Sequence, residues 1–288
     1  MTYEIALGDR AYSSWSLRGW LLFERFGIPC KARYARLGSD ALRTLIQEFH
    51  PARTVPAVRF PEVAIGDSLA IAEELAVRHP GVGIWPRGPA ARALARSLAA
   101  EMHSGFRPLR SGCTMNLRVS YAHFPVDEAI TDNLRRLEVI WDYARRATGS
   151  SGPWLCGDYS AADAFFAPVA ARIASYALEV SASAQAYVEA HLDDPAFRRW
   201  RAMSLVDGDD RLEYFHDCPR REWPGPTPLP ARAVQHGKPE NSACPYSGKP
   251  AAYLMETGGR FFGFGTAFDR DKTLSDPEAW PEFVRLFK

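Results

Sequence analysis

The stretch Tyr12-Ser-Ser-Trp-Ser-Leu-Arg18 lies between a short apolar segment, residues 3–7, and a longer one, residues 15–26. The first segment predicts a β-strand, and the second predicts a mostly buried helix that ends at Gly27-Ile-Pro29. The serines therefore fall at a helix N-terminus, where unpaired N–H groups and the helix dipole favour a negative charge. A hydroxyl there can donate a hydrogen bond to a thiolate and lower the pKa of the thiol. Ser13 or Ser14 can equally be an ordinary helix cap.

Arg53-Thr-Val-Pro56 stands just before two small predicted strands, residues 57–60 and 63–65. A cis Val55–Pro56 bond would turn the backbone of Val55 toward an extended, peptide-like ligand, and an ordinary trans proline is the alternative. Gly66-Asp-Ser-Leu-Ala-Ile71 then opens a predicted helix over residues 68–79. Ser68 and the backbone N–H groups could bind a carboxylate there, and Asp67 an ammonium group, or both residues could simply cap the helix.

A strand over residues 31–37 and a helix over residues 40–49 complete an α/β pattern in the first eighty residues. Residues 80–89 hold three prolines and three glycines, which predicts a linker. The chain beyond this linker is helical in pattern, and helices are predicted over residues 90 to about 118, 126–147, 161–177, 184–191 and 195–204. Ser160 and Asp163 form a capping box, for which we expect a structural role only.

A second, proline-rich linker is predicted between residues 219 and 230. Gly258-Gly259 separates two short strand candidates, residues 253–257 and 260–264, and so predicts a hairpin. Ser275-Asp-Pro-Glu278 should then start a terminal helix. The predicted domains are an α/β domain at residues 1–81, an all-helical domain at residues 90–218 and a small α+β extension at residues 231–288.

The composition excludes several classes of protein. The chain has 288 residues, 47% of them hydrophobic and 24% charged, and a formal net charge of +1. Intrinsic disorder of the whole chain, nucleic-acid binding through a basic field and a polybasic membrane anchor are therefore not expected. The longest apolar stretch, residues 161–171, contains Asp163 and Pro168, so no membrane span is expected. The absence of a signal-like N-terminus and of any C-x-x-C pair among five cysteines favours a reduced, cytoplasmic protein.

The order of these segments resembles the glutathione S-transferase superfamily over about residues 1–210. Ser13-Ser-Trp-Ser-Leu-Arg18 is similar to the S-S-x-S-x-R signature of its serine-type, zeta-like classes, and Glu101-Met-His-Ser-Gly-Phe-Arg-Pro-Leu109 is similar to their S-G-x-x-P-L helix segment. The resemblance implies a thioredoxin-like N-terminal domain followed by an all-α helical-bundle domain. It also implies glutathione as co-substrate, a small electrophile as second substrate, and a homodimer.

The resemblance implies specific roles for the residues at the first helix and at the proline turn. Ser13 matches the hydroxyl that activates the thiol of glutathione, and Ser14 is its neighbour in the loop. Val55 matches the residue whose backbone pairs with the cysteinyl part of glutathione, and Pro56 matches the cis-proline.

The charged ends of glutathione are assigned by the same resemblance. Asp67 and Ser68 match the pair that holds the γ-glutamyl end. Arg53 and Thr54 stand where a polar residue often reaches the glycine carboxylate. Since glutathione carries one ammonium group, two carboxylates and one thiol, each assigned residue complements one of its groups.

Two positions depart from the zeta pattern. Zeta enzymes carry Cys where Trp15 stands, so Trp15 should form an aromatic wall of the site or a plug in the core. Zeta isomerases also carry an Arg near the middle of the central helix, where this chain has Ser175, with Arg172 one turn earlier. This departure argues against maleylacetoacetate isomerase activity.

A pocket for the second substrate is expected between the two domains, near the first and fourth helices. The candidates on the fourth helix are His103, Phe106, Arg110 and Met115. His103 can instead be a satisfied imidazole of the surface or core. Arg110 would select anionic substrates, because a guanidinium binds carboxylates well.

The C-terminal extension distantly resembles small metal-binding modules of the YHS/TRASH type, through Cys244-Pro-Tyr-Ser-Gly-Lys-Pro250 and the hairpin after it. Those modules place a C-x-x-C after the hairpin, whereas this chain reads Phe264-Gly-Thr-Ala-Phe268. A lone Cys244 cannot supply a tetrahedral site. We therefore expect a metal-free relic that packs on the helical domain. The run Arg198-Arg-Trp-Arg201 is interpreted as a solvated helix face.

The leading hypothesis is a cytoplasmic glutathione transferase that activates the thiol of glutathione for attack on, or reversible addition to, a small electrophile. A non-catalytic binding or regulatory protein with the same fold is the alternative. A metal-handling role of the extension is a third possibility, which metal analysis of the protein would decide.

Overall fold

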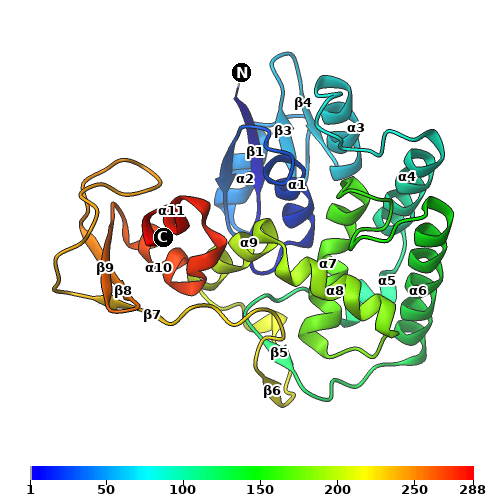
Figure 1. The fold of residues 1–288 in the computed structure, drawn as a ribbon. Helices are drawn as coiled ribbons and strands as arrows, with labels where there is room; N and C mark the ends of the chain where they lie inside the picture. The colour runs from blue at the N-terminus through cyan, green and yellow to red at the C-terminus, as the bar shows by residue number, and fades with distance from the viewer. Residues whose placement is uncertain (1) are drawn as a thin grey trace. The chain divides into compact units, whose positions relative to one another are not determined.

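The computed structural model describes residues 2–288, and its first element of architecture is a four-stranded sheet of order β2-β1-β3-β4 (Figure 1). The strand β1 (Tyr3–Leu7) pairs in parallel with β2 (Cys30–Tyr34) and antiparallel with β3 (Ala57–Arg59). β3 pairs antiparallel with β4 (Ala64–Gly66). This mixed sheet, with a parallel β-α-β start and a closing hairpin, confirms the predicted thioredoxin-like domain.

Helices cover both faces of this sheet, because alternate residues of a strand point to opposite faces. On one face, Ala6 and Ala57 pack with apolar residues of α2 (Asp40–Gln47) and the turn after it. On the other face lie α1 (Ser14–Glu24) and α3 (Ser68–Arg78), which pack against each other.

The helix α1 approaches the proline turn closely at one glycine. A Cβ atom added at Gly19 would lie 2.6 Å from Cβ of Pro56 and 3.3 Å from Cδ1 of Ile5. Glycine at this position therefore allows α1 to lie directly on Pro56 and β1. The contact holds the helix N-terminus next to the Val55–Pro56 turn.

A helical layer follows, with α4 (Pro89–Ser104), α5 (Arg107–Gly112), α6 (Glu128–Thr148), α7 (Ala161–Tyr176) and α8 (Ala182–Asp193). Every residue of α7 is buried, and α7 packs against both α4 and α1. The predicted capping box of Ser160 and Asp163 is confirmed at the start of α7. Farther along the chain, the short helix η1 (Leu212–Tyr214) and the strand β6 (Arg220–Arg221), which pairs with β5 (Ser120–Tyr121), join the same layer.

The prediction of one helix from residue 90 to about 118 is wrong. α4 ends at Ser104, with Gly105 as its C-cap, and Phe106 has a left-handed backbone, with φ of 58°. A left-handed residue cannot continue an α-helix, and Pro108 then starts a new one, α5, which ends at Gly112. The segment after α5 is thereby released from helix geometry and can line a cavity.

The described chain divides into two compact units. The first extends to Leu192 and also includes residues Arg211–Pro224, and the second consists of residues Asp193–Asp210 and Gly225–Lys288. The helix α9 (Pro195–Val206), which was expected to close the all-helical domain, thus falls in the second unit. The domain boundaries at residues 81, 90, 218 and 231 stay a prediction.

The second unit contains the predicted hairpin, β8 (Tyr253–Thr257) and β9 (Arg260–Phe264), extended by β7 (Ala231–Val234). A helix that the sequence did not indicate, α10 (Ala267–Ser275), packs on α9 and β7. The terminal helix α11 (Pro281–Phe287) begins later than predicted, after the short helix η2 (Pro277–Ala279).

The interpretation of Arg198-Arg-Trp-Arg201 as a solvated helix face is wrong. Arg198 binds both carboxylate oxygens of Asp276, at 2.8 Å and 2.6 Å, and Trp200 is fully buried. Arg199 donates to the carbonyl of Ala279. These arginines hold α9 against the rest of the second unit through hydrogen bonds and an ion pair.

None of the helices found in residues 2–288 has both the length and the apolar character that crossing a membrane requires.

Candidate functional site

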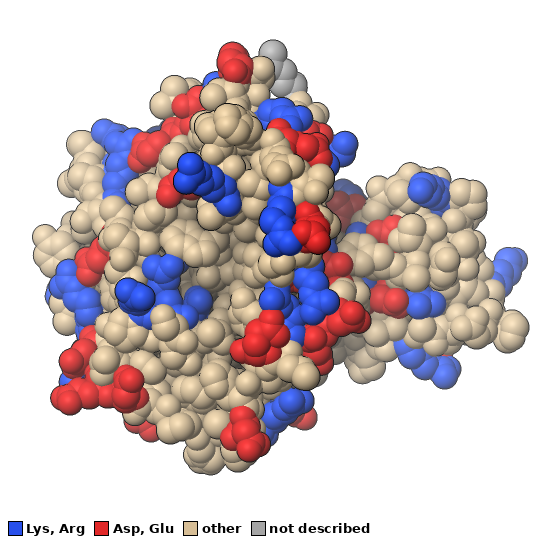
Figure 2. All heavy atoms as spheres, turned by 180° about the vertical axis from the view of Figure 1, so that it is seen from behind, with Lys and Arg blue, Asp and Glu red and all other residues tan. Residues whose placement is uncertain are grey.

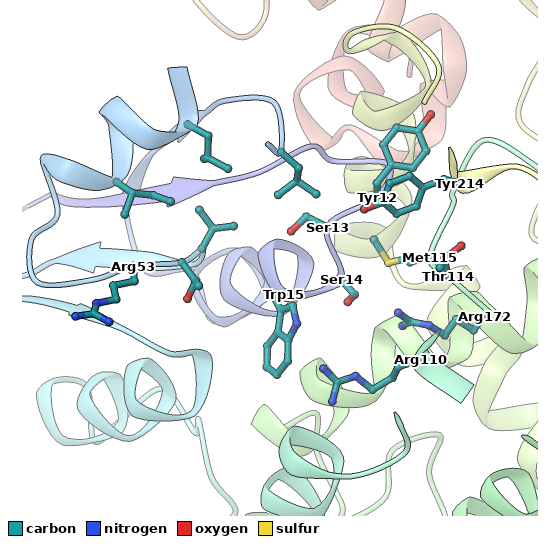
Figure 3. A pocket seen from close by; sticks show the side chains of 15 residues that line it. Tyr12, Ser13, Ser14, Trp15, Arg53, Arg110, Thr114, Met115, Arg172 and Tyr214 are labelled. Carbon is teal, nitrogen blue, oxygen red and sulfur yellow. The ribbon is translucent and has the colours of Figure 1, made fainter. Parts of the chain in front are cut away.

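A cavity of about 400 Å³ opens in the first unit beside the N-terminus of α1 (Figure 3). It collects residues from the loop before α1, from α2, from the Val55 turn, from α5 and the segment after it, from α7 and from η1. The lining residues are Tyr12, Ser13, Ser14, Trp15, Leu37, Leu42, Ile46, Arg53, Thr54, Val55, Arg110, Thr114, Met115, Arg172 and Tyr214.

Most of the site residues predicted from the sequence meet in this cavity: Ser13, Ser14, Trp15, Arg53, Thr54, Val55, Arg110 and Met115. The others do not line it, and these are Pro56, Asp67, Ser68, His103 and Phe106. Phe106 is buried at the break between α4 and α5. Arg53 and Thr54 are both exposed at the end of the cavity that the Val55 turn forms.

The two serines at the start of α1 have different surroundings. Ser13 is the N-cap of α1, and its hydroxyl accepts from the Ser16 N–H at 3.3 Å and donates to the Ser16 hydroxyl at 2.8 Å. Ser16 in turn accepts from the Gly8 N–H at 2.8 Å. Ser14 is half-buried and lines the cavity. Ser13 is thus both a cap and a wall of the cavity.

The Val55–Pro56 peptide bond is cis, as the sequence hypothesis required. β3 begins directly after Pro56, and its first residue, Ala57, pairs with Gly66 at the end of β4. Because Asp67 follows Gly66, it stands beside the Val55–Pro56 turn. The start of α3 is therefore next to the cavity, although its residues do not line it.

Asp67 caps α3 from a strained backbone, with φ of +72°. One carboxylate oxygen accepts from the N–H groups of Leu69 and Ala70, and the other lies 3.1 Å from Nε2 of His103. Ser68 is completely buried, and within residues 2–288 its hydroxyl finds no hydrogen-bond partner. A buried hydroxyl without a partner is costly, which marks this helix start as a place where a polar ligand group would be stabilised.

Trp15 forms one side of the cavity and contacts three polar side chains. The His103 ring meets the indole edge-on, with 5.0 Å between ring centroids. The guanidinium carbons of Arg18 and Arg110 lie 4.6 Å and 4.8 Å from its ring. Trp15 is thus a wall held by cation–π contacts, and His103 acts on Trp15 and Asp67 from outside the cavity.

Two arginines from different helices line the same end of the cavity. Arg172, on α7, donates to the carbonyls of Cys113 and Pro168 at 2.7 Å and 3.0 Å. Burial and the nearby charge of Arg110 lower the pKa of Arg172 to about 10. Burial also lowers the pKa of Arg110. Arg172 was not among the site residues predicted from the sequence, and the structure makes it a lining residue.

A third arginine, Arg18, lies behind Trp15. It is only 1% exposed. Burial lowers the pKa of Arg18 strongly, and the charges of Arg172 and Arg110 lower it further. In the part of the chain that the structure describes, Nε and Nη1 of Arg18 have no hydrogen-bond partner. Binding of an anion would relieve this concentration of positive charge.

The lining contains no Asp or Glu, so Arg53, Arg110 and Arg172 give it a positive charge. Figure 2 shows basic side chains gathered at a hollow of the first unit, whereas acidic and basic side chains are mixed over much of the same face. The cavity is therefore suited to a ligand that carries negative groups.

Tyr12 and Tyr214 form the side of the cavity beside the serine loop, and sequence analysis assigned no role to either. Their ring centroids are 4.7 Å apart. Tyr214 lies on η1, about 200 residues after the serine loop, so no local motif could have revealed this contact. Figure 3 shows the two rings on one side of Ser14 and Trp15 on the other.

The residues present fit a small peptide that carries a thiol, an ammonium group and carboxylates. An exposed arginine, Arg53, stands at one end, and a carboxylate with an adjacent unpartnered hydroxyl, Asp67 and Ser68, stands at the start of α3. The cis turn at Val55 and the helix N-terminus at Ser13 line the same cavity as Arg53. An extended peptide placed along them would bring its central side chain to the serine loop.

Within the described residues 2–288, no group of three or more His, Cys, Asp or Glu side chains could hold a metal ion. All five cysteines are free thiols. Cys244 is buried in the second unit, 3.8 Å from a carboxylate oxygen of Asp269. The expectation that the extension holds no metal stays a prediction.

Known proteins resemble this chain in both sequence and structure. Residues 12–78 match the family described as glutathione S-transferase, N-terminal domain. Maleylacetoacetate isomerase of Rattus norvegicus is 28% identical over 177 residues, which cover 60% of this chain and 78% of that protein. A probable maleylacetoacetate isomerase of Caenorhabditis elegans is 32% identical over 102 residues, or 35% of this chain and 47% of that protein.

Solved structures share the fold at low sequence identity. A glutathione transferase homolog from Burkholderia gl BGR1, solved with bound glutathione, is 23% identical, with a TM-score of 0.54 over 71% of this chain and 98% of that one. A Tau class glutathione S-transferase from mango, Mangifera indica, has a TM-score of 0.54 at 18% identity, over 69% of this chain and 92% of that one. Residues 12–78 thus match the glutathione S-transferase N-terminal domain family, in a chain that shares the fold of a glutathione transferase homolog over about 71% of its length.

Proposed function

We propose that this protein is a glutathione transferase that activates the thiol of glutathione for attack on, or reversible addition to, a small anionic electrophile. The single observation that carries this proposal is the meeting of Ser13, the cis Val55–Pro56 turn and two arginines, Arg110 and Arg172, around one cavity. The first two complement a thiol peptide, and the arginines complement a second, negatively charged substrate.

Ser13 can stabilise a thiolate without moving any heavy atom of the loop. Its oxygen accepts from the Ser16 N–H, and only its proton points at the Ser16 hydroxyl. A thiolate is a stronger acceptor than a neutral hydroxyl, so the Ser13 O–H turns to it when it is present. The N-terminal dipole of α1 stabilises the same negative charge. Together they lower the pKa of the bound thiol and raise the thiolate fraction at neutral pH.

The remaining contacts position the peptide. Val55 offers its backbone in the cis turn, and Arg53 and Thr54 lie where one carboxylate would end. Ser68 supplies its unpartnered hydroxyl to the γ-glutamyl carboxylate, and Asp67 attracts the ammonium group. Glutathione supplies the nucleophilic sulfur, and these residues hold it at the N-terminus of α1.

Arg110 and Arg172 select the electrophile. A guanidinium binds a carboxylate through charge-assisted hydrogen bonds, and two guanidinium groups that repel each other bind an anion more strongly than either would alone. The similarity to maleylacetoacetate isomerases supports reversible addition followed by isomerisation as one form of the reaction. Arg172 stands one turn before Ser175, the position matched to the isomerase arginine, and its presence in the cavity weakens the argument against isomerisation.

Titration calorimetry with glutathione and a conjugation assay with an anionic and a neutral electrophile test this proposal. We expect glutathione to bind and the anionic electrophile to be converted with the higher kcat/KM. Glutathione binding with no turnover on any electrophile would favour the alternative, a binding or regulatory protein of the same fold. Failure to bind glutathione would contradict both.

We also propose that the protein works as a homodimer in the cytoplasm, where reduced glutathione and free thiols are maintained. Sedimentation of the purified protein tests the dimer. The YHS/TRASH-like ancestry of the extension likewise stays a proposal, and metal analysis of the purified protein tests whether the extension is metal-free.

A further inference from the structure

The segment around Tyr214 is held near the serine loop by several hydrogen bonds and an ion pair, all within the first unit. The Arg211 N–H donates to the Tyr12 hydroxyl at 3.1 Å. Nη1 of Arg211 donates to a carboxylate oxygen of Asp9 at 3.1 Å and to the carbonyl of Leu37 at 2.9 Å. The side chains of Arg211 and Asp9 are only 14% and 19% exposed, so solvent screens this ion pair only partly.

A second set of bonds holds the segment from the helical side. Nδ2 of Asn116, which is completely buried, donates to the carbonyl of Tyr214 at 3.2 Å. The His216 N–H donates to the Tyr121 hydroxyl at 2.9 Å. Beyond it, β6 pairs with β5. Tyr214 is therefore fixed from both sides, and its ring is a preformed wall that needs little ordering when a ligand binds.

The opposite wall, Trp15, is equally fixed by Arg18 and Arg110. Figure 3 shows Ser14 between the two walls, with Arg110 and Arg172 at the end of the cavity. Rigid aromatic rings on two sides and guanidinium groups at the end complement a flat ring with a carboxylate, because aromatic rings interact favourably in stacked or edge-on contact.

We propose that Tyr214 is a specificity-determining residue of the electrophile subsite, and that with Trp15 it selects flat aromatic carboxylates over small or bulky aliphatic ones. Arg211 is a positioning residue that acts through Tyr214. This inference rests on the proposed function and adds the class of its second substrate.

Two probe substrates distinguish the contribution of an aromatic ring in the substrate from the contribution of its carboxylate. 4-Chloro-3,5-dinitrobenzoate is a flat aromatic carboxylate, and chloroacetate is a small carboxylate without a ring. With both, the thiol proton passes to solvent, the sulfur forms a bond to the carbon that carries chlorine, and chloride leaves with the bonding electron pair. The KM of each probe and the dissociation constant of glutathione are measured for every variant.

Tyr214→Ala should raise the KM of the aromatic probe about fivefold, since one ring contact is lost. The KM of chloroacetate and the dissociation constant of glutathione should each change less than twofold. Tyr214→Phe keeps the ring, so its KM for the aromatic probe should stay well below that of Tyr214→Ala. Tyr143→Ala, on the exposed surface of α6, is the matched control for loss of a tyrosine ring.

Arg211→Gln should raise the KM of the aromatic probe about twofold, with chloroacetate unchanged. Leu37 still donates to Asp9 at 2.7 Å, so the loop keeps one of its bonds. An unchanged KM in Arg211→Gln would overturn the positioning role.

The inference and the proposed function fail in different ways. If Tyr214→Ala changes the KM of both probes or the affinity for glutathione to the same extent, or changes none of them, the selective wall is refuted while the transferase activity stands. If the unaltered protein neither binds glutathione nor converts either probe, the proposed function itself fails.

Discussion

The two ends of the cavity are built in different ways. The end proposed for glutathione uses residues close together in sequence: the serine loop, the Val55 turn and the start of α3 all belong to one small sheet domain. The end proposed for the electrophile combines Trp15 with Arg110, Arg172 and Tyr214, from four segments up to about 200 residues apart. Short motifs therefore predict the first end, whereas packing of α7 and η1 creates the second.

The difference extends to charge. At the end proposed for glutathione, we assign Asp67 to the ammonium group of the ligand and the helix N-termini to its negative groups. At the electrophile end, the buried Arg172 and the half-buried Arg110 lie near each other, and the lining offers them no carboxylate. Substitutions at one end should therefore change the affinity for glutathione, and those at the other the choice of electrophile.

The largest effect is expected from Arg172→Met. Loss of a buried charge-assisted contact should lower kcat/KM for an anionic electrophile about 100-fold, which corresponds to roughly 3 kcal/mol. A neutral electrophile, 1-chloro-2,4-dinitrobenzene, should change less than threefold. Arg172→Lys keeps the charge and is the matched control. An equal loss of kcat/KM with both electrophiles would show that Arg172 supports the fold of the site and does not bind the negative charge of the substrate.

Ser13→Ala should raise the pKa of the bound thiol by about one unit, which lowers the thiolate fraction and the rate at neutral pH about tenfold. Ultraviolet titration of the thiolate in the complex measures this pKa directly. The dissociation constant of glutathione should stay within threefold.

Ser14→Ala is the matched control for the serine loop, because Ser14 lines the same cavity but does not cap α1. We expect a shift of the thiol pKa well below that of Ser13→Ala. A larger shift in Ser14→Ala would transfer the activating role to Ser14.

Asp67→Asn should weaken glutathione binding about fivefold, since the charge that attracts the ammonium group is lost while the side chain can still cap α3. Calorimetry with glutathione and with an analogue that lacks the α-amino group checks this assignment. The analogue should bind both forms of the protein equally. If the analogue also binds the variant more weakly, the effect comes from the cap and not from the ammonium contact.

The smallest effect is expected from pH. The lowered pKa of Arg172, about 10, means that its charge is lost as the pH rises through that value. The ratio of kcat/KM for the anionic electrophile to that for the neutral one should be constant from pH 7 to 9 and should fall about fourfold by pH 10.5. In Arg172→Met this ratio should not depend on pH. If this ratio of kcat/KM values stayed constant with pH in the unaltered protein, the anionic electrophile would not bind at Arg172.

The sequence by itself determined the first domain and the residues proposed to hold glutathione. Periodicity and turn residues specify β1, α1 and the hairpin of β8 and β9, because local backbone preferences act over a few neighbours. The cap at Ser13 and the capping box at Ser160 follow for the same reason. Local sequence left the Val55–Pro56 bond open between cis and trans, and the family resemblance implied the cis form that the structure shows.

Only the tertiary structure decided what surrounds the electrophile. The left-handed Phe106 ends α4 and frees the segment that carries Met115, and burial of α7 brings Arg172 into the cavity. Tyr214 is held at the cavity because Arg211 donates hydrogen bonds to Asp9 and Leu37. Such contacts join residues far apart in the chain, and their energies come from packing and desolvation, which no short stretch of sequence contains.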